Sequence, residues 1–445
     1  MGWSGLSAGM LAMFPVCEDF PLPFRQGGSF IEGLFPARAV PTTLELGFHH
    51  DGAHLRGIRK QAGRRRQFPW REGNRFELHV NGGEIFPAML AAIGAARRQI
   101  LLEMYLVESG ALCSRFIAAL GSAARRQVDV YLLFDAFGAA GLGQADRQRL
   151  RDAGVRLAFY NPLRYGALRR NLLRDHRKLL VVDERVAFVS GVGMTDDFDP
   201  GENPLRYWHD VAVQVEGPVV ADWTRVFRQN WRHWRQDALP RSVDPAPVVD
   251  AFPGQRGRVV SGRGFGSTEI QRAFIQRIVG ARQRVWMMTA YFVPSLRLRW
   301  ALRGAARRGV DVRLLLPGPI TDHPAVRYAG RRFYYSLLRS GVRIFEYQPR
   351  FLHAKALLCD QWVSLGSCNL DRWNLRWNLE GNQEVDDAPF AAHVRSLFET
   401  DFELSEECLR ETWHLRPWFR RWQEWFWGRV DALLERLGAR LRRRR

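Results

Sequence analysis

The chain has 445 residues, a length that predicts two or three domains of ordinary size. Because 46% of the residues are hydrophobic and 12% are aromatic, the chain can bury ordinary cores, which excludes a protein disordered throughout. Lysine and arginine together number 66 against 46 acidic residues. The resulting net charge of +20 points to partners that carry phosphate, either nucleic acid or an anionic membrane surface.

The apolar runs and the cysteines indicate in which cellular compartment the protein works. The best apolar run, residues 5–16, is interrupted by Pro15, has no basic segment before it and falls short of the roughly 18 residues needed to cross a bilayer. We therefore expect neither an integral membrane protein nor a secreted one. The five cysteines are scattered without a C-x-x-C pair, so we expect no disulfide framework and no zinc ribbon, and a reducing compartment fits best.

Five segments follow one another along the chain. We expect a poorly ordered extension over 1–71, a first α/β half over 72–240, a linker over 241–266, a second α/β half over 267–409 and a basic helix over 410–445. In each half, helices alternate with short apolar strands, a pattern that predicts a largely buried sheet. The first predicted helices are 86–98, 116–126, 270–282 and 296–308, and the strands that follow them are 99–107, 128–134, 285–293 and 310–315. A helix that ends at a glycine turn, a third strand and a strand with an H-x-K sequence complete each half.

The two halves repeat each other in sequence. Residues 123–130 recur at 305–312, and residues 154–157 recur at 341–344. The pattern H-x-K-x(4)-D occurs twice as well, 177 residues apart. Three landmarks in the same order at nearly one offset indicate an internal duplication. We predict an α/β fold of two tandem duplicated sandwich domains packed about a pseudo-twofold axis.

The two H-x-K motifs hold two of the chain's three lysines. His176 and Lys178 stand two residues apart, as do His353 and Lys355, and on a strand this spacing directs both side chains to one face. A pseudo-twofold axis would bring both pairs into one cleft. Such a set suits phosphodiester chemistry without a metal ion or other cofactor. One histidine attacks phosphorus, the other protonates the leaving oxygen, and the lysines bind the non-bridging oxygens.

Further side chains are candidates for holding the histidines or the phosphate. A nucleophilic histidine needs its second ring nitrogen held by an acid or a carbonyl. The candidates are Asp210 and Glu380, which follow the two motif histidines by 34 and 27 residues. Hydroxyl, amide and backbone donors for a bound phosphate are offered by Ser190, Gly366, Ser367 and Asn369.

For some residues the sequence does not decide between a functional role and a structural one. Residues at matching strand ends of the two halves either line the cleft or pack there: Glu103, Tyr105, Thr289 and Tyr291. For His323, in the sequence Asp-His-Pro, we favour a loop residue over a ligand. For His209 we favour a structural neighbour of Asp210.

The C-terminal segment combines tryptophan with arginine. Residues 410–445 hold 11 arginines against four acidic residues, and five of the 16 tryptophans. The i, i+4, i+7 spacing places four aromatic side chains on one arc of a helix: Trp418, Trp422, Trp425 and Phe426. This composition is typical of helices that lie on anionic lipid. A solvated basic helix that closes the fold is the alternative.

The duplicated motif, with Gly-Ser-x-Asn and Asn-x-Glu after its second copy, resembles the phospholipase D superfamily. Residues 86–90, 215–218, 291–294 and 341–382 are similar to bacterial cardiolipin synthases of the B type, which lack transmembrane helices. The resemblance spans roughly residues 72–405. It implies one active site formed by both halves, in which a phosphatidyl group passes through a phosphohistidine to the hydroxyl of a second lipid.

The resemblance also implies a role for each motif residue. His176 takes the place of the nucleophile, and His353 takes that of the general acid and base. Asp183 and Asp360, the last residues of the two motifs, brace the motif rather than touch the substrate.

Two positions depart from the family's pattern. Gly193 stands where the family's first half often has asparagine, which weakens phosphate holding there and leaves the choice of nucleophile open. Only five residues separate Asp360 from Gly366, where six are usual, and this spacing predicts a tighter hairpin.

We therefore expect a peripheral enzyme on the cytoplasmic side of the inner membrane that joins two phosphatidylglycerol molecules into cardiolipin and releases glycerol. Phosphatidylethanolamine stays open as the donor, an anionic membrane surface is the expected partner, and no nucleic acid is expected. Two alternatives remain. One is a phospholipase D-type hydrolase or nuclease with the same residues, and the other is a non-catalytic lipid-binding scaffold whose first half has decayed at Gly193.

Overall fold

The computed structural model describes residues 68–166, 168–201, 206–234, 239, 254–263, 269–369, 371, 377–413 and 415–443. Residues 1–67 of the predicted extension lie outside the described residues, as do 241–253 and 264–266 of the predicted linker. Among the described residues, no helix combines the length and the apolar character that crossing a bilayer requires.

Within the described residues, one mixed sheet of fifteen strands carries both halves. The strands of the first half are β1 (Arg71–Val80), β2 (Gln99–Met104), β3 (Asp129–Asp135), β4 (Arg156–Tyr160), β5 (Leu179–Val182), β6 (Val186–Ser190) and β7 (Val211–Glu216). Those of the second half are β8 (Gln255–Arg263), β9 (Arg284–Met288), β10 (Asp311–Pro317), β11 (Arg343–Tyr347), β12 (Ala356–Cys359), β13 (Trp362–Gly366), β14 (Leu379–Asp386) and β15 (Ser405–Glu407).

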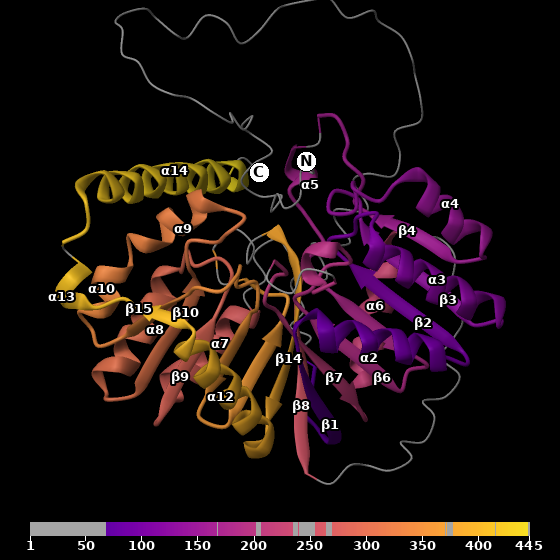
Figure 1. Cartoon of the computed structure of the whole chain (residues 1–445), viewed down its shortest axis with the longest axis horizontal. Helices are drawn as coiled ribbons and strands as arrows, with labels where there is room; N and C mark the ends of the chain where they lie inside the picture. Colours follow the sequence, from indigo (N-terminus) through magenta and orange to yellow (C-terminus); the bar gives the residue numbers. More distant parts are fainter. Residues whose placement is uncertain are drawn as a thin grey trace, which may run out of the picture. The chain divides into compact units, whose positions relative to one another are not determined.

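The strand order reveals the duplication directly. From the centre outward the first half runs β1-β7-β6-β5-β2-β3-β4, and the second half runs β8-β14-β13-β12-β9-β10-β11, with β15 added at its edge. Each strand of one half therefore has a counterpart at the same distance from the centre, where β1 and β8 pair antiparallel (Figure 1). This symmetric order confirms the predicted α/β fold of two duplicated halves about a pseudo-twofold axis.

Helices cover both faces of the sheet. The helices are α2 (Asn81–Ala95), α3 (Ala111–Arg125), α4 (Gln144–Asp152), α5 (Leu168–Asn171), α6 (Val220–Trp234), α7 (Glu269–Gly280), α8 (Leu296–Arg307), α9 (Pro324–Arg331), α10 (Tyr334–Leu338), α12 (Ala388–Glu403), α13 (Arg410–Trp413) and α14 (Trp418–Arg443), with a 3-10 turn at Asp196–Phe198. Helices α6 and α12 share one apolar core that spans both halves on one face. On the other face, α2 and α3 pack against the first half, and α7 and α8 pack against the second. Burial on both faces explains why most strands are apolar without alternation.

Two expectations from the sequence need correction. The H-x-K residues do not lie on strands, because β5 and β12 begin at Leu179 and Ala356, one residue after each lysine. The segment expected to be a linker contains β8, which pairs with β14 along eight residues and with β1. Only Val259 and Val260 give β8 an apolar centre among arginines and glycines, so its pattern did not indicate a strand.

The tight hairpin expected in the second half is present. Its closing pair is Cys359 with Trp362, across a turn of two residues, while the first-half pair is Val182 with Val186, across three. The glycine turns before β4 and β11 are also present, with a φ of 82° at Gly154 and a φ of 88° at Gly341. These positive angles are the ones that favour glycine at the end of a helix.

Candidate active site

The two halves meet through short backbone bridges immediately beside the motifs. Asp175, before His176, forms a parallel bridge with Leu379, and His209 forms one with Leu352, before His353. The amide of His176 donates to the Leu379 carbonyl at 2.9 Å, and the amide of His353 donates to the His209 carbonyl at 2.8 Å. Each motif is therefore paired with the residue that precedes the candidate acid of the other half.

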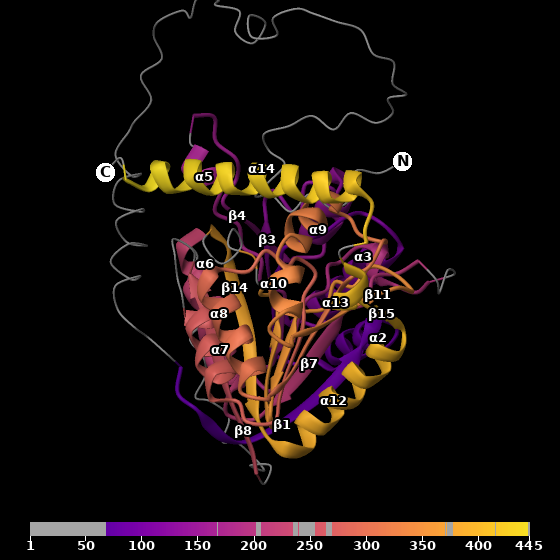
Figure 2. The same ribbon diagram turned by 90° about the vertical axis from the view of Figure 1, so that its left-hand side faces the viewer.

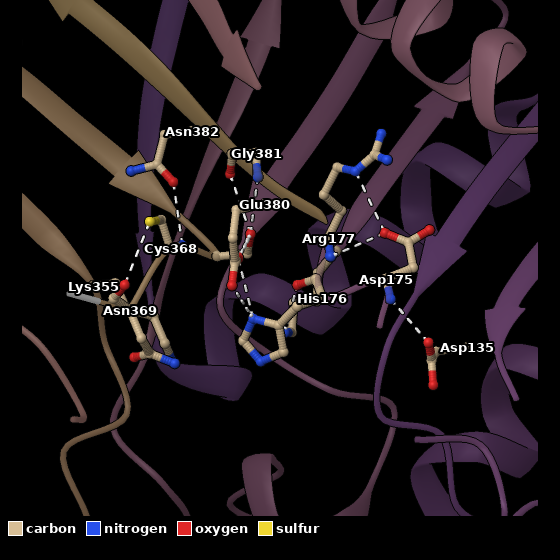
Figure 3. Close-up of polar contacts among 12 residues, drawn as sticks. Asp135, Asp175, His176, Arg177, Lys355, Cys368, Asn369, Glu380, Gly381 and Asn382 are labelled. Carbon is tan, nitrogen blue, oxygen red and sulfur yellow. Dashed lines mark hydrogen bonds and ion pairs between the residues drawn. The ribbon is translucent and has the colours of Figure 1, made fainter. Parts of the chain in front are cut away.

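This pairing brings each candidate acid to the histidine of the opposite half. Nδ1 of His176 lies 3.0 Å from Oε1 and 3.1 Å from Oε2 of Glu380. Nδ1 of His353 lies 2.6 Å from Oδ2 of Asp210. Figure 3 shows Glu380 directed at the His176 ring, with the other ring nitrogen facing away from it. All four residues are at most 7% exposed, so solvent screens these contacts little.

The two lysines make similar contacts with one difference. Lys178 Nζ donates to the backbone carbonyl of His176 at 2.8 Å and lies 5.1 Å from the centre of the Tyr105 ring. Lys355 Nζ donates to the backbone carbonyl of His353. It also stands 2.7 Å from Nδ1 and 3.0 Å from Nε2 of the same histidine. Of the two lysines, Lys355 is thus the one whose ammonium group contacts the ring of its own motif histidine.

Burial and the two lysines set the protonation of the site. Burial lowers the pKa of Lys178 to about 7 and that of Lys355 to about 8. Burial, and then the charge of the nearby lysine, lowers the pKa of His353 to about 3 and that of His176 well below its usual range. Both rings are therefore neutral in the empty site.

The two acids differ in their electrostatic setting. Burial raises the pKa of Glu380 well above its usual range. For Asp210, burial acts in the same direction, but the charge of Lys355 and the hydrogen bond from His353 outweigh it and lower the pKa. Asp210 is thus the more firmly ionised of the two acids.

The candidate phosphate donors occupy different places. Ser367 Oγ donates to Glu380 Oε2 at 2.6 Å and accepts from the Gly381 amide at 3.1 Å, so this hydroxyl holds the acid in place. Asn369 is fully buried, and neither its side-chain oxygen nor its nitrogen has a hydrogen-bond partner among the described residues. Gly366 has a φ of 155° and Ser190 ends β6, where its amide donates to the Lys178 carbonyl at 3.2 Å. The phosphate-binding role of these residues stays a prediction.

The last aspartate of each motif lies at a hairpin turn. The carboxylate of Asp183 accepts hydrogen bonds of 2.8 to 2.9 Å from the amides of residues 97–99. The carboxylate of Asp360 accepts three of 2.9 to 3.0 Å from the amides of residues 282–284. Both side chains therefore tie the hairpin that begins with the motif to the start of the neighbouring strand.

The first half has no room for a serine beside its acid. A Cβ atom on Gly191, the counterpart of Ser367, would lie 2.3 Å from Oδ1 of Asp210. At Gly193, the counterpart of Asn369, a Cβ atom would lie 3.0 Å from the Leu106 side chain. Of these two counterpart positions, Asn369 is the one that carries a side-chain amide.

A buried charged cluster behind His176 was not anticipated. Arg177 Nε lies 3.4 Å from Asp175, whose other oxygen accepts from Asn230 at 2.5 Å. Glu103, a candidate for lining the cleft, belongs to this cluster instead, 3.4 Å from Arg177 and 2.8 Å from Asn230. Asp135 accepts from the Asp175 amide at 2.8 Å, and Figure 3 shows Asp135, Asp175 and Arg177 on the side of the chain away from the His176 ring. The signal was the charged run Arg-Asp-His-Arg-Lys, whose counterpart in the second half is apolar apart from its histidine and lysine.

Aromatic rings surround the two histidines. Tyr105 lies 4.8 Å from the His176 ring. Three aromatic residues that the sequence analysis did not single out lie 5.1 to 5.7 Å from the His353 ring: Phe198, Trp208 and Phe351. They come from segments distant in the sequence, so no local pattern marks them.

The other residues whose role the sequence analysis left open lie near these aromatic rings or farther from the histidines. Tyr291 lies 6.4 Å from Phe351, while the Thr289 hydroxyl donates to the Tyr291 carbonyl at 3.3 Å. His209 is buried, with its ring nitrogens 2.7 Å from Asn81 and 2.9 Å from Asp401, a structural arrangement. His323 immediately precedes α9, in the loop after β10.

Comparisons with known proteins show which family the chain belongs to. A family model described as "Cardiolipin synthase, PLD-like domain" matches residues 89–231 and 274–402. The chain is 36% identical over 346 residues to cardiolipin synthase A of Pseudomonas aeruginosa (strain LESB58), covering 77% of this chain and 70% of the relative. It is 35% identical over 339 residues to cardiolipin synthase B of Salmonella typhi, covering 73% and 80%. These matches confirm the resemblance drawn from the two motifs.

A solved structure with the same fold is also found. The phosphatidylserine synthase of Haemophilus influenzae Rd KW20 has a TM-score of 0.64 and 13% sequence identity, covering 86% of this chain and 98% of that chain. At this identity the likeness concerns the fold alone, and it agrees with the duplicated α/β architecture.

Proposed function

The chain belongs to the cardiolipin synthase family of phospholipase D-like phosphatidyltransferases, and we propose that it joins two phosphatidylglycerol molecules into cardiolipin with release of glycerol. The observation that carries the proposal is the crossed site. Each motif histidine has its Nδ1 held by an acid of the other half, His176 by Glu380 and His353 by Asp210. Two histidines held in this way divide nucleophilic attack and proton transfer between them.

We assign the attack on phosphorus to His176. A hydrogen bond from its Nδ1–H to Glu380 leaves the lone pair on Nε2, and the lowered pKa of the ring keeps it neutral at pH 7. At His353, the ammonium group of Lys355 lies 2.7 Å from Nδ1 and 3.0 Å from Nε2, so its N–H groups compete for the lone pair of this ring. This asymmetry favours His353 as the general acid and base.

In the first step, Nε2 of His176 bonds to the phosphorus of the donor lipid as the bond to the head-group oxygen breaks. His353 gives that oxygen a proton, and glycerol leaves. The pKa of His353 is about 3 in the empty site, lowered by burial and by Lys355. The negative phosphate offsets the lysine charges, so substrate binding raises the pKa of His353 and loads it with the proton.

In the second step, a hydroxyl of another phosphatidylglycerol attacks the phosphorus and gives its proton to His353. The bond from phosphorus to His176 breaks, and its electron pair returns to Nε2. Lys178 and Lys355 neutralise the charge that builds on the non-bridging oxygens in both steps. The unpartnered amide of Asn369 adds a donor to the same oxygens.

The exposed face of α14 docks the protein on the anionic cytoplasmic surface of the inner membrane. Trp418 is 78% exposed, and Trp422 and Trp425 are each 56% exposed. The opposite face of the helix is fixed to the body, because Glu424 is buried and pairs with Arg331 of α9 and with Arg416. Figure 2 shows α14 lying over α9, at the opposite end of the sheet from the label of β8.

The position of α14 fits access of lipid to the site. The start of β12, next to Lys355, pairs with Met288 at the carboxyl end of β9, so the motifs lie at the carboxyl ends of the parallel strands. The loop from β10 to α9 leaves the sheet at this same edge. Aromatic side chains at this edge would place the site next to the bilayer surface.

The test of the activity uses the purified full chain with vesicles of labelled phosphatidylglycerol and phosphatidylethanolamine, without added metal, and mass spectrometry of the products. We expect cardiolipin and free glycerol, both absent with His176→Ala. Ethanolamine in place of glycerol would identify phosphatidylethanolamine as the donor. Phosphatidic acid alone would mean a hydrolase, and unchanged lipid would favour the nuclease or scaffold alternatives.

Membrane docking is tested by flotation with vesicles that contain phosphatidylglycerol. We expect Trp422→Ala combined with Trp425→Ala to lower the bound fraction. Trp300→Ala is the matched control, because Trp300 is 60% exposed on α8 and should leave binding unchanged. Equal loss in both variants would contradict a specific role for α14.

A further inference from the structure

The loop between β10 and α9 carries a buried acid that the reaction described above does not use. The Asp322 side chain is 7% exposed. Its Oδ2 accepts a hydrogen bond from the Tyr291 hydroxyl at 2.5 Å and lies 3.5 Å from Nε2 of His323. Its Oδ1 is buried and has no hydrogen-bond partner among the described residues. A buried carboxylate oxygen without a donor is unfavourable, and a ligand that donates a hydrogen bond would satisfy it.

A second acid of the same kind comes from the other half. Oδ2 of Asp197 is also buried without a partner among the residues that the structure describes. Its neighbour Asp196 differs, because its two oxygens accept hydrogen bonds from the amides of Ala111 and Leu112 at the start of α3. Asp196 therefore caps the start of α3, whereas no such structural contact explains the buried oxygen of Asp197.

Contacts place both acids on the His353 side of the site. Asp197 immediately precedes Phe198, whose ring lies 5.1 Å from the His353 ring. The carbonyl of Asp197 accepts from the amide of Trp208 at 2.7 Å, and the Trp208 ring lies 5.3 Å from His353.

Asp322 reaches the same histidine through the aromatic rings beside it. Its partner Tyr291 lies 6.4 Å from Phe351, which lies 5.7 Å from His353. Electrostatic coupling agrees with this placement. Burial lowers the pKa of Lys355, and Asp322 is one of the acids that oppose this lowering. Burial raises the pKa of Asp197, and the charge of Asp322 adds to this effect.

We propose that Asp322 and Asp197 form a subsite for the hydroxyl groups of the glycerol head group, with Tyr291 holding Asp322 in place. Unpaired carboxylate oxygens only accept hydrogen bonds, so the ligand must donate them, and their negative charge disfavours an anionic group placed directly against them. A neutral polyol fits both conditions. The proposal rests on the proposed function, because His353 is the group that exchanges a proton with the alcohol that leaves or enters.

The subsite acts in the second step, when an alcohol O–H attacks the phosphorus, the bond from phosphorus to His176 breaks and the proton passes to His353. When phosphatidylglycerol attacks, the one hydroxyl that stays free on its head group donates to Asp322 or Asp197. Free glycerol keeps two such hydroxyl groups and can donate to both acids. An alcohol that lacks these hydroxyl groups leaves the carboxylate oxygens unpaired. A site built in this way discriminates strongly against such an analogue.

The experiment offers the full chain deuterated glycerol and 1-propanol at equal concentration, with phosphatidylglycerol vesicles as donor. Mass spectrometry measures the ratio of deuterated phosphatidylglycerol to phosphatidylpropanol. Both alcohols compete for the same phosphohistidine, so the ratio does not depend on the first step or on the amount of active protein. We expect the native protein to favour glycerol.

Substitutions then test the two acids. We expect Asp322→Ala to shift the ratio about tenfold toward propanol, which corresponds to about 1.4 kcal/mol. Asp322→Asn keeps one acceptor oxygen and should shift the ratio less. Tyr291→Phe, which removes the hydrogen bond to Oδ2 of Asp322 and leaves the contact with His323, gives a second reading in the same direction. Asp129→Asn is the matched control, because Asp129 pairs with Arg156 at the edge of the sheet and should leave the ratio unchanged.

Two outcomes would overturn the inference. One is a native protein without preference for glycerol, and the other is an unchanged ratio in the Asp322 variants and in Tyr291→Phe while both products still form. A native protein that makes neither product contradicts the proposed function itself, and the inference falls with it.

Discussion

The carboxylate of Glu380 belongs to the second half of the chain, yet its two oxygens lie 3.0 and 3.1 Å from Nδ1 of His176 in the first half. The mirror contact, Asp210 to His353 at 2.6 Å, crosses in the other direction. Neither half therefore contains a complete pair of histidine and acid. The duplication forms a single composite site, and the backbone bridges beside the motifs fix its geometry.

Glu380, the acid of the second half that holds His176, should be needed for turnover. We expect Glu380→Gln to lower kcat by about 10²–10⁴-fold with little change in KM, because an amide no longer selects the Nδ1–H tautomer or stabilises the charge that develops on the ring. Cardiolipin formation in vesicles measures both constants. Glu399→Gln, on the exposed side of α12, is the control and should behave as the native protein does. A Glu380→Gln variant with native kcat would contradict the assigned role.

Activity should fall on the alkaline side. Burial lowers the pKa of Lys178 to about 7 and that of Lys355 to about 8, so both ammonium groups lose their protons, and their hold on phosphate, as the pH rises through this range. Because kcat/KM follows ionisations of the free enzyme, we expect it to decline above about pH 7. In Lys178→Arg, which does not titrate here, the decline should move to higher pH. A flat profile from pH 6 to pH 9 would show that neither lysine titrates in this window.

Phosphate binding should draw a proton into the site. The pKa of His353 is about 3 when the site is empty, because burial and Lys355 disfavour its charged form. A bound anion favours the protonated forms of His353 and of Lys178, whose pKa is about 7, so vanadate binding at pH 7 should take up protons. Calorimetry in buffers of different ionisation enthalpy measures their number. We expect His353→Gln to lower the uptake to the share of Lys178, and an unchanged uptake in the variant would assign all of it to other groups.

The first-half glycine beside Asp210 should tolerate no side chain. A Cβ atom on Gly191 would lie 2.3 Å from Oδ1 of Asp210, so we expect Gly191→Ala to destabilise the fold by about 1–3 kcal/mol and to lower kcat by displacing the acid. Gly94→Ala is the matched control, since nothing lies within 4 Å of its Cβ position in α2 and the change should be neutral or slightly stabilising. Urea unfolding compares the two, and equal stabilities would contradict the predicted clash.

Much of this site could be predicted from the sequence, because its residues belong to repeated local motifs. The two H-x-K patterns identified His176 and His353, and the repeat of the surrounding helices and strands predicted the fold. The partner of each histidine could not be predicted in the same way. Sequence spacing places Glu380 after His353 and says nothing about which histidine it contacts, since the bridge from Asp175 to Leu379 is a tertiary contact.

Other features escaped prediction for related physical reasons. Strand β8 is polar and rich in glycine, and it is a strand because β14 and β1 offer hydrogen bonds on both sides. The rings around His353 converge from Phe198, Trp208 and Phe351, which share no local pattern. Such features depend on how the halves pack, and local propensity does not encode that packing.

Trapping the covalent intermediate tests the central claim most directly. The full chain is mixed with phosphatidylglycerol vesicles, quenched without acid and digested, and mass spectrometry locates the phosphatidyl group on the peptides. The account predicts the modification on His176 in the native protein and none in His176→Ala. With a p-nitrophenyl ester of phosphatidic acid, whose leaving group needs no proton, His353→Ala should still form the adduct. Modification of His353, or an adduct that survives in His176→Ala, would contradict the account.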